Sequence, residues 1–202
     1  MLDTSESLSV CEAELGCPCE QLFTPLSRFL PQRPEAPFAI DNGAFAGFNL
    51  QGFLSLLDRE YPRRHLCRFV AVPDVVGSAR RTLELFETWR YKLQHWPLAL
   101  VMQDGQENLP IPWDAISAAF IGGSTEWKKS KAAADCIRAA KAMPSPIWVH
   151  AGRVNTPGRF EYFEDLGADS IDGTGLSRYT WMRQDIYDLE HNPRLFPKVA
   201  HA

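Results

Sequence analysis

The chain repeats one unit several times: a short apolar run, then a polar or glycine-containing turn, then a helical stretch. Within each run the apolar residues are consecutive and do not alternate with polar ones, which is typical of strands buried on both faces of a parallel sheet. Six such runs occur, within residues 37–45, 68–76, 98–104, 118–124, 146–154 and 168–175. This pattern restricts the fold to the parallel α/β class.

The segments between the runs have helical periodicity and capping residues. Helices are expected over 78–94, 126–143 and 156–167. Ser78 is suited to cap the first helix, and Thr156 followed by Pro157 is suited to begin the third, which Gly167 ends. The first choice of fold is therefore a compact α/β (β/α) TIM-type barrel, and an open doubly wound sheet is the alternative.

Length and composition indicate one globular domain. The chain has 202 residues, of which 45% are hydrophobic and 23% charged, and a single domain usually has about 100–200 residues. Residues 1–36 are irregular and rich in proline, and we assign them to the same domain as the barrel, which we place at 37–202. Whether the first segment supplies a strand is left open by its sequence.

Several functional classes are excluded by composition. No apolar run approaches the length of about 20 residues that a membrane span needs, and the acidic start does not resemble a secretory signal, so a cytoplasmic protein is expected. A net charge of −4 argues against non-specific nucleic-acid binding through a broad basic surface. The five cysteines are expected as free thiols. The spacing of Cys11, Cys17 and Cys19 does not match a common zinc motif, so zinc binding by these three with Cys67 or a histidine is the minority alternative. No metal or cofactor is predicted.

Polar residues follow the apolar runs at the point where each strand ends. In parallel α/β folds these carboxyl ends form the ligand-binding face, so the side chains should converge there. The residues are Asp41, Asp74, Gln103, Asp104, Gly122, Gly123, His150, Arg153, Asp169 and Asp172. Each aspartate alone has an equally good structural interpretation as a helix cap or turn residue. Several carboxylates at one rim, however, repel each other unless they bind something, are protonated or are hydrogen-bonded.

The order of these motifs resembles the tRNA-guanine transglycosylase superfamily. The motifs are D-N-G-A-F, V-P-D, V-M-Q-D-G, I-G-G and A-D-S-I-D-G, between about residues 37 and 178. The strings FVAVPDVVGSARRTL, FIGGSTEWKKS, VHAGRVN and DSIDGT are similar to a small phage and actinobacterial branch related to the DNA 7-deazaguanine transglycosylases. The resemblance implies a (β/α) barrel that exchanges a purine base on an intact nucleic-acid strand.

The resemblance also implies roles for individual residues. Asp172 matches the nucleophile that attacks the anomeric carbon of the sugar, and Asp41 matches the acid/base residue beside the guanine. Asp74 matches the carboxylate that accepts hydrogen bonds from the ring N–H and the 2-amino group. Gln103 and the backbone of Gly123 match the groups that hold the 6-oxo edge.

Further residues are expected around this site. Substrate contacts are expected from Gly122, Asp169 and His150, and phosphate contacts from Arg153, Lys128 and Arg178. Phe45 and Trp127 are candidates to stack on a base, although for Phe45 a place in the core is favoured.

Glycosidic cleavage fits these residue types. It passes through an oxocarbenium-like state that a carboxylate stabilises or captures, and a carboxylic acid of raised pKa can protonate the leaving base. A pentosyltransferase that replaces guanine in DNA with a 7-deazaguanine, for example 7-cyano-7-deazaguanine, is the leading hypothesis. No cysteine follows Cys136, so the zinc site of the tRNA enzymes is missing, which favours DNA over tRNA, with a free nucleoside as a further option.

Two alternatives stay open. The first is a deazapurine nucleoside or nucleotide hydrolase, in which water resolves the intermediate. The second is a non-catalytic subunit that binds a purine or supports a partner. The sequence leaves the oligomeric state open, with a homodimer among the options, and a phage-encoded protein of this kind would act in the host cytoplasm.

Overall fold

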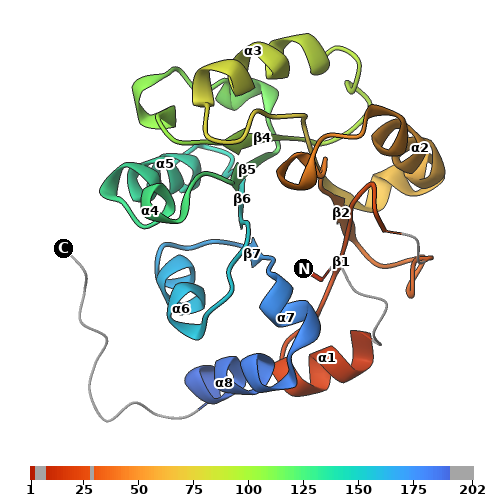
Figure 1. Cartoon of the computed structure of the whole chain (residues 1–202), viewed down its shortest axis with the longest axis vertical. Coiled ribbons are helices and arrows are strands. Elements are labelled where there is room, and N and C mark those ends of the chain that lie inside the picture. The colour runs from red at the N-terminus through yellow and green to blue at the C-terminus, as the bar shows by residue number, and fades with distance from the viewer. Residues whose placement is uncertain (3–7, 28–29, 192–202) are drawn as a thin grey trace.

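The strands form one parallel sheet whose spatial order follows the order of the chain, β1 to β7. Figure 1 shows the computed structural model, which describes residues 1–2, 8–27 and 30–191. The strands are β1 (Gln21–Phe23), β2 (Phe38–Ile40), β3 (Cys67–Ala71), β4 (Leu98–Met102), β5 (Ala118–Ile121), β6 (Trp148–Ala151) and β7 (Ser170–Ile171). All six apolar runs of the sequence contain a strand, and β1 is added by the N-terminal segment, which settles the point left open above.

The sheet is strongly curled. The rings of Phe69 on β3 and His150 on β6 have centroids 5.1 Å apart, although β4 and β5 lie between these strands. In a flat sheet three strand spacings would separate them by about 14 Å. The strand order also never reverses, as it does at the switch point of a doubly wound sheet. The fold is therefore the TIM-like α/β arrangement, and the doubly wound alternative was wrong.

The first two residues of the chain lie between the two edges of the sheet. Leu2 pairs in parallel with Gln21 of β1, and the backbone nitrogen of Met1 donates to the carbonyl of Ile171 on β7. Backbone groups of both edge strands thus find partners in the same short segment, which joins β7 to β1.

The inside of the curl is lined by mostly small side chains. Ala39, Ala71, Ala99 and Ala118 come from four successive strands, and the larger Phe69 and Phe120 rings meet edge to face at 6.0 Å. The outward residues of the same strands are buried under helices, so that all five residues of β4 are buried. This two-sided burial explains why the apolar runs are continuous.

Helices cover the outside of the sheet (Figure 1). The α-helices are α1 (Leu8–Leu15), α2 (Leu50–Glu60), α3 (Ala79–Trp89), α4 (Thr125–Lys128), α5 (Lys131–Lys141), α6 (Pro157–Asp165), α7 (Thr174–Arg178) and α8 (Thr180–His191). Short 3-10 helices are η1 (Ala44–Ala46), η2 (Tyr61–Leu66), η3 (Gln106–Asn108) and η4 (Trp113–Ala115). The helix expected over 126–143 is two helices, because Ser130 begins a new helix by accepting a hydrogen bond from Ala133.

Capping was predicted correctly for one helix and incorrectly for another. Thr156 accepts from the backbone nitrogen of Arg159 and Pro157 takes the first helical position, as expected for α6. Gly167 follows that helix with a φ of 83°, a left-handed conformation that favours glycine. Ser78 precedes α3 but its side chain makes no capping hydrogen bond.

The N-terminal segment is more ordered than its sequence suggested. Leu8, Cys11 and Leu15 of α1 share a buried cluster with Met182 and Ile186 of α8, and the two helices lie side by side in Figure 1. Because α1 is short, its stability comes from this contact more than from its own sequence. Residues 192–202, at the end of the predicted barrel domain, lie outside the described part of the chain.

Enlarging a side chain inside the curl should destabilise the protein. We expect Ala99→Leu to lower the free energy of unfolding by about 1–3 kcal/mol, because β-strands on all sides leave no room for added methylenes. Urea unfolding followed by circular dichroism measures this change. Ala139→Leu on the exposed face of α5 is the matched control and should change stability by less than about 0.5 kcal/mol. Equal effects of the two substitutions would contradict the assignment of Ala99 to a filled interior.

Candidate functional site

A pocket of about 400 Å³ opens at the carboxyl ends of the strands. The segments that line it follow β1, β2, β3, β4, β5, β6 and β7, as expected for the ligand-binding face of such a fold. Of the predicted site residues, those that line it are Asp41, Asp74, Gln103, Gly122, Arg153, Asp172 and Arg178. Three carboxylates that are far apart in the sequence therefore share one cavity.

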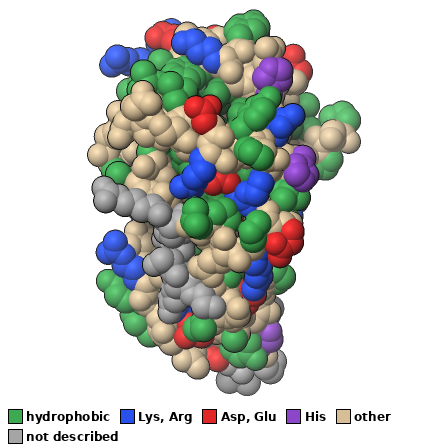
Figure 2. All heavy atoms as spheres, turned by 90° about the vertical axis from the view of Figure 1, so that its right-hand side faces the viewer, with side chains coloured by type: hydrophobic (Ala, Val, Ile, Leu, Met, Phe, Trp, Pro, Cys, Tyr) green, Lys and Arg blue, Asp and Glu red, His purple; other side chains and the backbone are tan. Residues whose placement is uncertain are grey.

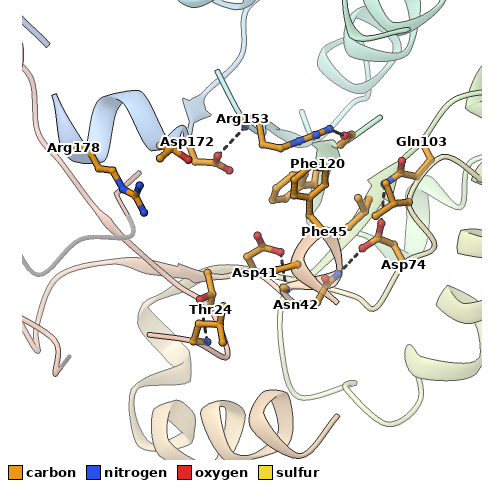
Figure 3. Close-up of a pocket in the computed structure, with 17 residues that line it drawn as sticks. Thr24, Asp41, Asn42, Phe45, Asp74, Gln103, Phe120, Arg153, Asp172 and Arg178 are labelled. Atoms are coloured by element: carbon orange, nitrogen blue, oxygen red, sulfur yellow. Dashed lines mark hydrogen bonds between the residues drawn. The ribbon is translucent and has the colours of Figure 1, made fainter. Parts of the chain in front are cut away.

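The three carboxylates occupy different sides of the pocket (Figure 3). Asp74 lies beside Gln103 at one end, Asp172 lies at the other end toward Arg178, and Asp41 lies between them. The pocket therefore has two distinct ends: one with hydrogen-bonding groups around Asp74, and one lined by the carboxylate of Asp172.

Asp74 is held from two sides by carboxamides. Its Oδ1 accepts from Nδ2 of Asn42 at 2.8 Å and its Oδ2 accepts from Nε2 of Gln103 at 2.7 Å. The Oε1 of Gln103 accepts from the backbone nitrogen of Gly77, which fixes the orientation of the Gln103 amide. Burial raises the pKa of Asp74 above its ordinary value, and the two carboxamide hydrogen bonds offset this only in part.

Asp172 is held at both carboxylate oxygens by N–H groups. Oδ1 accepts from the backbone nitrogen of Arg153 at 2.8 Å, and Oδ2 lies 3.0 Å from Nε2 of His150. Burial by itself would raise the pKa of Asp172, but the hydrogen bonds from His150 and from Arg153 bring it below the ordinary value. The side chain stays 15% exposed, toward the pocket. Asp172 is therefore an oriented and ionised carboxylate.

Asp41 follows β2 and begins a tight turn. Its backbone nitrogen donates to the carbonyl of Phe23 on β1 at 2.8 Å, and its Oδ1 accepts from the backbone nitrogen of Gly43 at 3.2 Å. Gly43 has a φ of 74°, and this left-handed conformation lets the chain fold back so that the Asp41 side chain lines the cavity.

Arg153 lies across the pocket and not toward solvent. Its guanidinium donates to the carbonyls of Gly122 and Gly123 at 2.5 and 2.6 Å, and it stacks 4.3 Å from the centroid of the Phe45 ring. Its φ of 59° is the left-handed value that only this non-glycine residue adopts within the described residues. Arg153 thus lines the pocket with its guanidinium held by contacts within the site, and its expected phosphate contact stays a prediction. Phe45 is 68% exposed, so its predicted core position was wrong.

Two of the expected substrate residues lie away from the cavity. Asp169 precedes β7, accepts from the backbone nitrogen of Val149 and pairs with Lys141 at 2.7 Å, so it sits at the opposite end of the strand from Asp172. His150 is completely buried inside the curl and reaches the site only through Asp172. The sequence correctly predicted that both residues lie on or beside strands. It did not predict that Asp169 lies at the opposite end of its strand from the pocket, or that the His150 side chain points into the interior of the curl.

Three further expectations fail for local reasons. The backbone nitrogen of Gly123 donates to the carbonyl of Met102, so it is engaged within the protein and does not hold a 6-oxo edge. Lys128 is buried and its Nζ donates to the carbonyl of Gly152, so it is not a surface phosphate ligand. Burial lowers the pKa of Lys128 to about 8. Trp127 is buried in the main core and does not stack on a base.

Asn42 and Thr24 are site residues that the sequence interpretation missed. Asn42 is part of the motif D-N-G-A-F but was given no functional role; its Oδ1 accepts from the backbone nitrogen of Ala44, and its Nδ2 donates to Asp74 and to the carbonyl of Val72. Thr24 follows β1 and lines the pocket. Asn42 could have been predicted as a site residue because it is polar and directly follows Asp41 at the end of a strand. Thr24 could not, because the sequence did not predict the strand β1 that it follows.

The described part of the chain offers no cluster of metal ligands, and the face shown in Figure 2 is not broadly basic. It contains no group of three or more His, Cys, Asp or Glu side chains arranged to hold a metal ion. Its helices are too short or too polar for any of them to cross a bilayer. In Figure 2 the basic side chains are scattered among hydrophobic and acidic ones. Several arginines also pair with glutamates, as Arg33 does with Glu12 and Arg68 with Glu20.

Comparisons with known proteins give no family assignment. No family model matches the chain, and no curated protein matches it. Among solved structures, one described as "Native KDPGal structure" is similar over 84% of this chain and 92% of that chain, with 12% sequence identity and a TM-score of 0.39. That similarity is too low to carry an argument about function, which therefore depends on the geometry of the pocket.

Loss of the Asn42 side chain should weaken both the fold and the site. We expect Asn42→Ala to lower the free energy of unfolding by about 1–3 kcal/mol, because it leaves the buried carbonyl of Val72 without this donor. Urea unfolding measures the change. Asn108→Ala, in which an exposed amide is removed from Glu107, is the matched control and should be nearly neutral. An equally small effect at Asn42 would contradict the conclusion that its hydrogen bonds stabilise the fold.

Proposed function

We propose that this protein is a base-exchange transglycosylase that replaces guanine in DNA with a 7-deazaguanine base. The observation that supports this most directly is the pocket in which Asp41, Asp74 and Asp172 meet with Gln103. A flat heterocycle with N–H groups on one edge needs acceptors at one end of such a cavity, and glycosidic chemistry needs a carboxylate at the other.

The end of the pocket around Asp74 suits the polar edge of guanine. An ionised Asp74 carboxylate retains lone pairs to accept hydrogen bonds from the ring N1–H and the 2-amino group. The amide nitrogen of Gln103 carries two hydrogens and donates one of them to Asp74. Its second hydrogen is suited to the 6-oxo group. Asn42 and Gln103 keep these groups oriented before a base arrives, which lowers the entropy cost of binding.

The end around Asp172 suits the sugar. In the proposed reaction an oxygen of Asp172 forms a bond to the anomeric carbon while the bond from that carbon to N9 of guanine breaks and its electron pair leaves with the base. Asp41 in its acid form donates a proton to the leaving guanine, and its carboxylate then accepts the proton lost by the incoming base. Attack by the new base on the anomeric carbon releases Asp172 and restores the nucleic-acid strand.

The proposal favours DNA as the polymer, bound by a small area of the protein around the pocket. Arg178 is exposed and lines the pocket, so it is placed to contact a phosphate beside the reacting nucleotide. Three exposed apolar side chains line the same pocket and are suited to contact an unstacked base: Leu26, Phe45 and Val76. With a net charge of −4, binding would depend on this local site and not on a broad basic surface.

Removal of the nucleophile should abolish exchange. With guanine-containing oligonucleotides and labelled 7-cyano-7-deazaguanine, we expect Asp172→Asn to lower the incorporation rate by at least about 10³-fold, since a carboxamide cannot form the covalent intermediate. Asp185→Asn on the exposed face of α8 is the matched control and should incorporate at the wild-type rate. Denaturing mass spectrometry should detect a protein–oligonucleotide adduct that maps to Asp172.

The outcomes separate the proposal from its alternatives. Free guanine released from a nucleoside without any incoming base would identify a hydrolase. Tight purine binding with neither release nor incorporation would identify a binding subunit. Full incorporation by Asp172→Asn would overturn the assignment of the nucleophile.

Base binding should weaken at low pH. Because burial raises the pKa of Asp74, the carboxylate becomes protonated at a higher pH than an ordinary aspartate, and the protonated form accepts fewer hydrogen bonds from guanine. Below that raised pKa we expect the Kd for guanine, measured by calorimetry, to rise about tenfold per pH unit. Asp74→Asn should bind weakly at every pH and lose this dependence, whereas Gln103→Leu should move the transition to higher pH. An unchanged transition in Asp74→Asn would contradict the role of Asp74.

A further inference from the structure

We infer that His150 is a positioning residue: as a neutral imidazole with its proton on Nε2, it donates to Asp172 and holds that carboxylate ionised and oriented toward the pocket. The catalytic meaning of this arrangement rests on the function proposed above, but the protonation state of His150 can be tested without it. The inference is based on four buried or half-buried residues. Trp148 and His150 lie on β6, Ser170 lies on β7, and Asp172 follows β7 directly.

The hydrogen bonds form one chain from β6 to the pocket. Trp148 Nε1 lies 2.8 Å from Oγ of Ser170, which lies 2.8 Å from Nδ1 of His150. On the other side of the ring, Nε2 of His150 lies 3.0 Å from Oδ2 of Asp172. The chain thus runs from an indole through a hydroxyl and an imidazole to the proposed nucleophile.

Both ends of this chain fix its direction. The Trp148 indole nitrogen can only donate, so Ser170 accepts from it and keeps its own proton for another partner. The ionised Asp172 can only accept, so Nε2 of His150 must carry a proton. In a neutral imidazole Nδ1 is then an acceptor, and the Ser170 hydroxyl supplies its donor. Every group in the chain is satisfied by this one arrangement of protons.

The surroundings of His150 favour the neutral ring. The side chain is completely buried, and the Phe69 and Phe120 rings lie 5.1 and 4.6 Å from it. Burial lowers the pKa of His150, and the hydrogen bond to Asp172 opposes this only in part. Besides Asp172, the charged groups near it are Lys128 and the amino group of Met1, and both further disfavour an imidazolium. The guanidinium of Arg153 points away, to the glycine carbonyls.

The consequence for Asp172 is that its two direct hydrogen-bond donors carry no charge, while the positive amino group of Met1 acts on it electrostatically. His150 donates to Oδ2 and the backbone nitrogen of Arg153 donates to Oδ1, so two neutral N–H groups orient the carboxylate. A salt bridge would hold the carboxylate as firmly, but it would partly neutralise the negative charge with which the carboxylate oxygen attacks the anomeric carbon. Neutral donors stabilise the ion while leaving its negative charge on the pocket side.

Nitrogen-15 NMR of the histidine rings tests the protonation state directly. In long-range ¹H–¹⁵N spectra of the full chain, we expect His150 to show a protonated Nε2 and an unprotonated Nδ1, unchanged between pH 5.5 and 8. The exposed His65 and His95 serve as comparisons within the same spectrum. Ser170→Ala removes the donor to Nδ1 and should perturb the His150 signals. An imidazolium, or a proton on Nδ1 in the wild type, would overturn the inference whether or not the protein exchanges bases.

Activity variants test the effect on Asp172. His150→Phe keeps an aromatic ring but loses the donor, so the acid limb of the pH profile of kcat should move to higher pH, with KM for the base little changed. His150→Gln places an amide N–H near the former Nε2 and should move the limb back toward the wild-type position. A role confined to packing predicts the opposite order, with His150→Phe closest to the wild type.

A readout that needs no activity accompanies these variants. The ¹³C carboxyl signal of Asp172 should titrate at a higher pH in His150→Phe than in the wild type and in His150→Gln. If His150→Phe fails to fold, Ser170→Ala is measured in its place and should shift the same signal in the same direction. If the signal moves as expected but no substrate is exchanged, the proposed function fails and the inference about His150 stands. If neither variant moves the signal, the inference is wrong.

Discussion

The structure depends on how tightly the parallel sheet is curled, and that curl depends on small side chains inside it. Ala39, Ala71, Ala99 and Ala118 leave room for the rings of a few larger residues to meet across the sheet. Only because β3 and β6 approach in this way does His150 contact Phe69 and Phe120 and lie below Asp172. The same curl turns the carboxyl ends of all the strands toward one cavity, so the packing of the interior also determines the geometry of the site.

A second constraint is that carboxylates in a cavity must be hydrogen-bonded if they are to stay charged. Asp74 and Asp172 meet it in the same way, with neutral donors on both oxygens, but the outcomes differ. For Asp74 burial dominates and its pKa is raised, whereas for Asp172 the hydrogen bonds dominate and its pKa is lowered. The two carboxylates therefore differ in proton affinity, as their proposed roles of base-binding acceptor and nucleophile at opposite ends of the pocket allow.

Interpretation from the sequence failed where a side chain's direction mattered more than its position. Arg153 on a loop, Lys128 at the end of α4 and His150 on β6 all lie near the site, but each side chain turns toward the protein. Arg153 bonds to two glycine carbonyls, Lys128 to the carbonyl of Gly152, and His150 to Asp172. Asp169 differs from Asp172 by three positions and therefore lies at the other end of a very short strand. A motif string cannot distinguish these cases, because the carbonyls and rings that capture the side chains come from distant segments.

The sequence by itself determined the alternation of strands and helices after residue 36 and the parallel class of the sheet, because continuous apolar runs and local capping residues are properties of neighbouring positions. It also placed Asp41, Asp74, Gln103 and Asp172 after strands, where a parallel sheet collects polar groups. Only the tertiary structure decided between the expected curled sheet and its open alternative, formed α1 against α8, and brought Asn42 to support Asp74. It also decided that Lys128 is buried and in which direction the pKa values of Asp74 and Asp172 are shifted. These features depend on burial and on hydrogen bonds between residues distant in sequence, and such contacts do not exist until the chain has folded.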